Sequence, residues 1–166
     1  AGTSKELGQT QLNEIIENVV LAESINRYRV AAPKIAARRK AGQFVIVRID
    51  EYGERIPLTI ADADPERGTI TLVVQAVGKS TAQMSTLRPG DRLLDVVGPL
   101  GAPTHIERVG TVAVVAGGIG IAPAHPIAQA FRAAGNTVIA ILGARSKDLM
   151  IMEDEMRQAA DEVLVC

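Results

Sequence analysis

The chain has 166 residues, 47% of them apolar and 22% charged, which is enough to bury the core of one domain or of two small ones. Its formal net charge of -1 gives no electrostatic case for binding nucleic acid or an anionic membrane, because both partners require a basic face. Cys166 is the only cysteine, which excludes an internal disulfide framework and an iron-sulfur site built within this chain.

The chain opens with a polar stretch, residues 1–13, that lacks an initiating methionine. We expect this stretch to be a leader or tag remnant outside the fold. The sequence has no signal-peptide pattern, and none of its apolar runs approaches the ~18 residues of a membrane span. We therefore expect a cytoplasmic protein.

The first half of the chain alternates short apolar segments with turn formers. Residues 80–87 read as one short helix, and turns are indicated at Gly42, at Gly53 and across 62–68. The pattern therefore predicts an antiparallel barrel or sandwich over residues 14–100. The predicted strands are 15–21, 28–32, 44–49, 57–60, 69–77 and 92–97.

The pattern changes near residues 98–104, where Gly-Pro-Leu-Gly-Ala-Pro interrupts the strands. Longer apolar runs follow and alternate with helices, which is typical of a parallel sheet covered on both faces. The predicted strands are 111–116, 137–142 and a third one beginning at Leu164, and the predicted helices are 124–134 and 148–160. A sheet that ends here leaves one edge unpaired. We therefore expect residues 101–166 to be the N-terminal half of a nucleotide-binding α/β domain, in a protein of about 250 residues.

A glycine-rich turn joins the first parallel strand to the next helix, with Gly117, Gly118 and Gly120 followed by Pro123. Glycines let backbone N-H groups approach a pyrophosphate, and a helix start adds a partial positive charge. Pro123 stands where the third glycine of G-x-G-x-x-G belongs, so the usual dinucleotide fingerprint is incomplete. The alternative is a tight turn without a ligand.

A second anion-type motif is Gly78-Lys79-Ser80-Thr81. A P-loop would need a glycine where Val73 stands, so nucleotide hydrolysis is disfavoured. The motif still predicts either a helix start that holds an anion or an ordinary helix cap with a solvated lysine.

Two residues around the fourth predicted strand also suit a flavin nucleotide. Arg55 could clamp a pyrophosphate with its planar guanidinium, or could be a surface charge. Thr59 offers a hydroxyl on the same strand.

These motifs, in this order, resemble the ferredoxin-NADP reductase superfamily, and within it the electron-transfer subunits of the dihydroorotate dehydrogenase and NADH-dependent ferredoxin:NADP oxidoreductase type. The resemblance covers residues 13–166. It implies a six-stranded Greek-key barrel that binds FAD, followed by an α/β domain that binds NAD(P)H. It also implies a larger oxidoreductase subunit as partner.

The resemblance implies roles for the residues of the motifs. Pro57, Leu58 and Thr59 would line the isoalloxazine, with the Thr59 hydroxyl near flavin N5 as the catalytic contact. Val73, Val74 and Gln75 would flank the ribityl and adenosine parts, and Gly78, Lys79, Ser80 and Thr81 would hold the FAD pyrophosphate. Gly117, Gly118, Gly120 and Pro123 would form the nicotinamide-nucleotide loop, which Arg145 would reach from the next strand.

The sequence departs from the superfamily at three points. The flavin strand has Ile56 and Leu58 where Arg and Tyr of an Arg-x-Tyr-Ser motif stand, so Arg55 is displaced by one residue and faces the other way. Aromatic residues make up 2% of the chain, which leaves Tyr52 as the nearby aromatic that could compensate. The cysteines that bind a [2Fe-2S] cluster in these subunits have no counterpart here, so no metal site is expected.

The leading hypothesis is an FAD-dependent NAD(P)H oxidoreductase subunit that takes hydride from NAD(P)H and passes single electrons to an iron-sulfur centre or partner subunit. The alternative is a non-catalytic flavin-binding or partner-binding module. We expect His105 and His125 in surface or loop positions. The other charged groups are expected to be solvated: a loop with Lys34, Arg38, Arg39 and Lys40, and a helix face with Glu153, Asp154 and Glu155.

Overall fold

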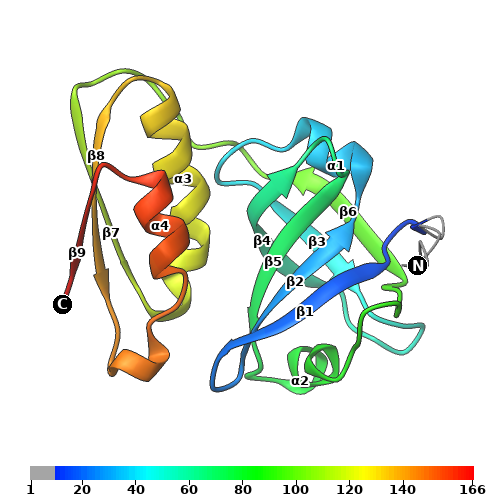
Figure 1. Ribbon diagram of the computed structural model, residues 1–166. Helices are drawn as coiled ribbons and strands as arrows, with labels where there is room; N and C mark the ends of the chain where they lie inside the picture. The colour runs from blue at the N-terminus through cyan, green and yellow to red at the C-terminus, as the bar shows by residue number, and fades with distance from the viewer. Residues whose placement is uncertain (1–9) are drawn as a thin grey trace, which may run out of the picture.

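The computed structural model describes residues 10–166, which form a β barrel followed by a smaller α/β unit (Figure 1). The barrel contains β1 Ile15–Ala22, β2 Ile25–Ala31, α1 Pro33–Arg38, β3 Phe44–Arg48, β4 Ile56–Asp64, β5 Thr69–Gln75, α2 Lys79–Ser85 and β6 Asp95–Leu100. The α/β unit contains β7 Thr111–Gly117, η1 Gly118–Gly120, α3 Ile121–Ala133, β8 Thr137–Gly143, η2 Lys147–Leu149, α4 Glu153–Ala159 and β9 Glu162–Val165. The predicted fold class is confirmed.

The barrel strands follow the order β1-β2-β5-β4-β3-β6, with every neighbouring pair antiparallel. Strand β2 pairs with β5 instead of β3, which gives the Greek-key crossover. Strand β1 is joined to the segment that precedes β6, where Ile15 N donates to Asp91 O at 2.8 Å. Tyr28 on β2 points into the core, is 1% exposed, and has its pKa raised to about 12 by burial.

Most of the predicted leader, residues 1–9, lies outside the described residues. Its last residue, Asn13, is bonded to the barrel: the Asn13 N-H donates to Ala31 O at 2.8 Å, and the Asn13 carbonyl accepts from Leu93 N at 3.0 Å.

The α/β unit is a parallel sheet in the order β7-β8-β9. Helices α3 and α4 both lie on the face of this sheet that is turned toward the barrel (Figure 1). Val138, Ala140 and Leu142 of β8 face these helices and are 0% exposed, whereas Val115 of β7 points to the opposite face and is 73% exposed. Within residues 10–166 no helix covers that opposite face.

One apolar cluster connects the two parts of the molecule. Ala61 of β4 and Val73 of β5 lie on the outer wall of the barrel and belong to the same buried cluster as Ile121 and Ala122 of α3. The barrel and the α/β unit therefore share a core along this contact.

Several predicted element boundaries were wrong. Strand β4 continues through Asp62 to Asp64, which the sequence suggested as a turn, because pairing with β5 holds these residues extended. Strand β2 begins at Ile25, three residues early, after a tight turn in which Ser24 has φ 59°. The last strand of the barrel is shifted to Asp95–Leu100, and the predicted helix 148–160 is split by Met152, whose φ is 55°.

The predicted basic loop was also wrong. Pro33–Arg38 is a helix, with Pro33 in its first turn, where the missing N-H costs nothing. Arg39 follows the helix and donates to Asp62 at 3.3 Å from a side chain that is only 16% exposed. Burial lowers the pKa of this guanidinium. The helix is too short for its apolar face to show a helical period in the sequence.

Helix α3 starts at Ile121, three residues before the predicted start, and so includes Pro123 in addition to Pro126. Pro123 occupies the first turn, directly after η1, and has no N-H to donate. Pro126 lacks the N-H that would bond to Ala122 O in a regular helix.

The connection between the two sheets, residues 101–110, is fixed at both ends. Thr104 N donates to Ala41 O at 2.9 Å. At the other end the buried Asn136 side chain accepts from Val109 N at 2.7 Å and Gly110 N at 3.0 Å. The Asn136 amide also donates to two carbonyls at 3.0 and 2.9 Å, so all its polar capacity is used. These bonds limit how far the α/β unit can move relative to the barrel.

We expect Gly42→Ala to lower the free energy of unfolding by about 1–3 kcal/mol, because Gly42 has φ 90° and an added Cβ would collide with the Thr104 side chain. Gly90→Ala is the matched control: Gly90 has φ 97°, but a Cβ there meets nothing within 4 Å. Urea denaturation should show the larger loss for Gly42→Ala. Equal losses would mean that contact with the 101–110 connection contributes nothing.

Candidate functional site

A cleft of about 590 Å³ lies between the barrel and the α/β unit, where strands β7 and β8 end. Its lining comes from both parts: Ile25 and Gln75 from the barrel, and Gly117, Gly118, Ile119, Gly143, Ala144, Arg145 and Leu149 from the α/β unit. Ligands of open α/β sheets bind outside the carboxyl ends of the strands. The cleft has the location of a nucleotide site.

The barrel topology brings further predicted residues to this end. Strands β4 and β5 are antiparallel, so the start of β4, with Thr59, and the end of β5, with Gln75, lie at the same end of the barrel. Three residues after Gln75 the chain reaches Gly78, the N-cap of α2. In Figure 1, α2 lies at the end of the barrel where β5 stops.

The glycine turn on the α/β side is open to a ligand. Gly118 has φ 55°, and a Cβ at Gly118 or Gly120 would meet nothing within 4 Å, so the backbone can be approached closely. The turn forms η1, which leads directly into the thirteen-residue helix α3; the Ile121 N-H already donates back into η1, so the N-H groups that precede the helical bonds belong to the glycine turn. Gly117 pairs with Gly143, which places the ends of β7 and β8 side by side.

The start of α2 has a cap made by its own residues. Thr81 Oγ1 accepts from Val77 N and from Gly78 N, both at 3.0 Å. The first helical bond is Ala82 N to Gly78 O at 2.8 Å, so the N-H groups of residues 79–81 precede the helical ladder. Ser80 is 9% exposed and Lys79 is exposed.

The predicted flavin strand presents alternate side chains to two faces. Pro57 is exposed and Thr59 half-buried on the outer side, whereas Leu58 packs against the barrel core. Arg55 is directed to Asp95 at 3.3 Å, with its side chain 55% exposed. Tyr52 lies in the turn after β3 and is 94% exposed.

The three predicted residues of β5 also face different ways. Val74 belongs to the barrel core and Val73 to the cluster shared with α3. Gln75 alone of the three lines the cleft. Any contact between a cofactor and Val73 or Val74 would have to involve main-chain atoms.

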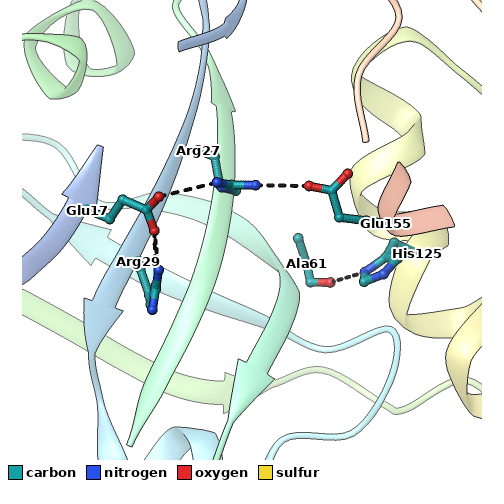
Figure 2. A network of polar contacts seen from close by, with 6 residues as sticks. All are labelled: Glu17, Arg27, Arg29, Ala61, His125 and Glu155. Carbon is teal, nitrogen blue, oxygen red and sulfur yellow. Dashed lines mark hydrogen bonds and ion pairs between the residues drawn. The ribbon is translucent and has the colours of Figure 1, made fainter. Parts of the chain in front are cut away.

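A network of polar contacts crosses the interface between barrel and α/β unit (Figure 2). Arg27 of β2 donates through Nη1 to Glu155 of α4 at 2.9 Å and through Nη2 to Glu17 of β1 at 3.3 Å. Arg29 donates to the other oxygen of Glu17 through Nε at 3.1 Å and through Nη2. The hydrogen bonds from Arg29, with the charges of both arginines, lower the pKa of Glu17 although partial burial opposes the shift.

Two sequence expectations fail in this network. His125 is 3% exposed, not at the surface, and its Nδ1 lies 2.9 Å from Ala61 O. Glu155 is not simply solvated, because it pairs with Arg27 across the interface. His105, in contrast, is exposed as expected, with its side chain 84% accessible. The one sequence signal for His125 was its position in an otherwise apolar segment, which does not reveal a partner 64 residues away.

No group of three or more His, Cys, Asp or Glu side chains within residues 10–166 could hold a metal ion. None of the helices in this range combines the length and apolar character needed to cross a membrane.

Residues 12–105, which include the barrel and the open helix start, match the family model of the oxidoreductase FAD-binding domain. The chain belongs to this family, which confirms its resemblance to the ferredoxin-NADP reductase superfamily.

The chain is similar to several known proteins. It is 48% identical over 159 residues to a Thermotoga maritima protein described as a dihydroorotate dehydrogenase B (NAD(+)) electron transfer subunit homolog, covering 96% of this chain and 56% of the relative. Identity is 32% over 148 residues to the corresponding electron transfer subunit of Fusobacterium nucleatum, covering 86% and 57%.

Among solved structures, an NADH-dependent reduced ferredoxin-NADP oxidoreductase studied for flavin-based electron bifurcation superimposes with a TM-score of 0.91 at 48% identity. The match covers 96% of this chain and 58% of the other. The chain therefore spans a little over half the length of the relatives it matches.

We expect Glu17→Gln to weaken the protein at neutral pH and to have progressively less effect in acid. Because the folded-state pKa of Glu17 lies below its ordinary value of 4.5, its contribution to stability is present above pH 4.5 and is lost as the pH falls through the folded-state pKa. Urea unfolding of both proteins at several pH values measures this. A difference that stays constant from neutral pH into acid would contradict it.

Proposed function

We propose that this chain is the FAD- and NAD(P)H-binding part of a flavoprotein electron-transfer subunit. The observation that carries the proposal is the cleft, in which Gln75 of the barrel faces Gly117, Gly118 and Arg145 of the α/β unit. In a family that binds FAD on its barrel, such a cleft suits a second, nicotinamide-bearing ligand.

The barrel residues present fit a flavin nucleotide. We propose that the N-H groups of Lys79, Ser80 and Thr81 bind the pyrophosphate, since Gly78 leaves open space in front of them. Pro57 and Thr59 lie on the outer face of β4, where Thr59 Oγ1 can donate or accept a hydrogen bond at the ring edge. When bound, FAD would supply the acceptance of a hydride and the release of electrons one at a time. Arg55 is engaged with Asp95, so we assign it no contact with the phosphates.

The α/β residues fit a nicotinamide nucleotide. We propose that backbone N-H groups of the turn at Gly117, Gly118 and Gly120 donate to the phosphates, and that Arg145 adds a positive charge at the neighbouring strand end. Pro123 in the first turn of α3 has no N-H, so these donors would come from the turn that precedes the helix. No side-chain acid or base is required, because the task of these residues is to orient two rings and exclude water.

The descriptions of two relatives support a proposal for where the electrons go after they leave the flavin. One is described as an electron transfer subunit of dihydroorotate dehydrogenase B and another as a homolog of that subunit. We propose that this chain likewise serves a larger oxidoreductase subunit through an iron-sulfur centre, whose ligands are not found among residues 10–166.

The test is anaerobic reduction of the flavin-loaded protein. We expect purified or FAD-reconstituted protein to be yellow and to bleach when NADH or NADPH is added, as followed by visible absorbance. A colourless protein that takes up no FAD would contradict the proposal. A yellow protein that neither nucleotide bleaches would indicate a flavin-binding module without nucleotide oxidation.

A variant at the cleft tests the nucleotide side separately. We expect Arg145→Gln to raise the half-saturating NAD(P)H concentration about 10-fold to 100-fold, the cost of losing a hydrogen bond to a charged group, while flavin content stays unchanged. Arg157→Gln is the control, because Arg157 pairs with Glu153 within α4 and does not line the cleft. Stopped-flow reduction at several nucleotide concentrations gives both values. Equal effects of the two substitutions would remove Arg145 from the site.

A further inference from the structure

We infer that His125 is a positioning residue, which holds the strand carrying Thr59 at a fixed distance from the glycine turn of the α/β unit. The inference rests on the proposed function, because it concerns how the two cofactor sites are kept in register. Two observations support it: a buried hydrogen bond between α3 and β4, and a bulge in β4 at the residue that accepts this bond.

The acceptor carbonyl belongs to a bulge. Strand β4 pairs Ile60 with Leu72 and Asp62 with Thr71, so β4 advances two residues while β5 advances one. Ala61 is the extra residue and is left out of the register. Its carbonyl oxygen lies 2.9 Å from His125 Nδ1 and is satisfied by the α/β unit (Figure 2).

The nature of the acceptor determines that a particular ring nitrogen of His125 carries a proton. A carbonyl oxygen can only accept, so Nδ1 of His125 must carry the proton and donate. His125 is 3% exposed and Ala61 0% exposed, so both partners of the bond are buried. Loss of the donor would leave a buried carbonyl without a partner, which costs more than the bond itself contributes.

The bond lies close to both proposed cofactor elements. Ala61 is two residues from Thr59, about 7 Å along the strand. His125 is one turn from Ile121, the first residue of α3, which follows directly on Gly118–Gly120. The bond therefore connects the proposed flavin strand to the proposed nucleotide turn by a short path through regular structure.

A second contact also holds the α/β unit against the barrel. Arg27 joins Glu17 of the barrel to Glu155 of α4, and Arg27 lies two residues from Ile25, which lines the cleft on the same face of β2. These side chains are about 28–35% exposed, so the ion pair is weaker than the buried His125 bond. Together the two contacts oppose a rotation of α3 and α4 against the barrel wall.

The test compares His125→Leu, which removes the donor, with His125→Asn, whose amide nitrogen can take the place of Nδ1. In the flavin-loaded protein we expect His125→Leu to reduce the rate of flavin reduction at saturating NAD(P)H about 10-fold to 100-fold, the range expected for a shift of up to 1 Å between reacting groups. Flavin affinity should not change, and His125→Asn should recover most of the rate. A wild-type rate in folded His125→Leu overturns the inference.

A distance measurement gives a second readout that needs no reaction. Spin labels at Glu66→Cys and Asp154→Cys, both exposed sites, with Cys166→Ser to remove the native thiol, report the separation of barrel and α/β unit. We expect a narrow distribution for His125 and for His125→Asn, and a broader or shifted one for His125→Leu. An unchanged distribution overturns the inference even if the protein reduces no flavin, whereas failure of the wild type to be reduced concerns the proposed function alone.

Glu155→Gln tests the second contact across the same interface, the ion pair with Arg27, independently of His125. We expect it to broaden the distance distribution and to slow reduction in the same direction, by a smaller factor. Glu153→Gln is the matched control, because it removes an ion pair that lies within α4 and does not reach the barrel. Equal behaviour of the two glutamate variants would overturn the role of the interface network.

Discussion

The packing of α3 against the outer wall of the barrel is the constraint on which the cleft depends. Small residues make this approach close, since Ala61 and Ala122 are both fully buried in the shared cluster. Close-packed interiors resist small displacements, so the contact fixes how the strand ends of the α/β unit face the barrel. The cleft lies beside this contact, because Ile25 belongs to the shared cluster and also lines the cleft, together with Gln75 and Gly118. Its width therefore depends on the packing next to it.

The scarcity of aromatic residues shapes the site in a second way. The chain has two tyrosines and no tryptophan; Tyr28 fills the barrel core and Tyr52 is exposed in a turn, so neither lines the cleft. The cleft is lined by aliphatic side chains such as Ile25 and Leu149 and by glycine backbone. A planar ligand would consequently be held by peptide planes and aliphatic contacts, and its orientation would depend on hydrogen bonds more than on stacking.

Local patterns predicted much of the architecture because they report local physics. Alternation along β2 follows from one buried and one outer face, and the continuous apolar runs of β7 and β8 are typical of a parallel sheet, although within residues 10–166 helices cover only one of its faces. Prediction failed where distant pairing overruled the local signal. Asp62 to Asp64 look like a turn, but β5 holds them extended; Pro33–Arg38 is too short to show a helical period. The predicted site residues of β5 were consecutive in sequence, and a strand sends consecutive side chains to opposite faces.

The sequence by itself determined that an antiparallel barrel precedes a parallel sheet and that glycine turns occur at Gly78 and Gly117–Gly120, because turn chemistry and hydrophobic period are properties of neighbouring residues. Only the tertiary structure decided which of these residues share a cleft and what holds its two sides together. His125 and Ala61 are 64 residues apart, and Arg27 and Glu155 are 128 apart. No local pattern encodes such pairs, since they depend on how a completed barrel and a completed helix meet.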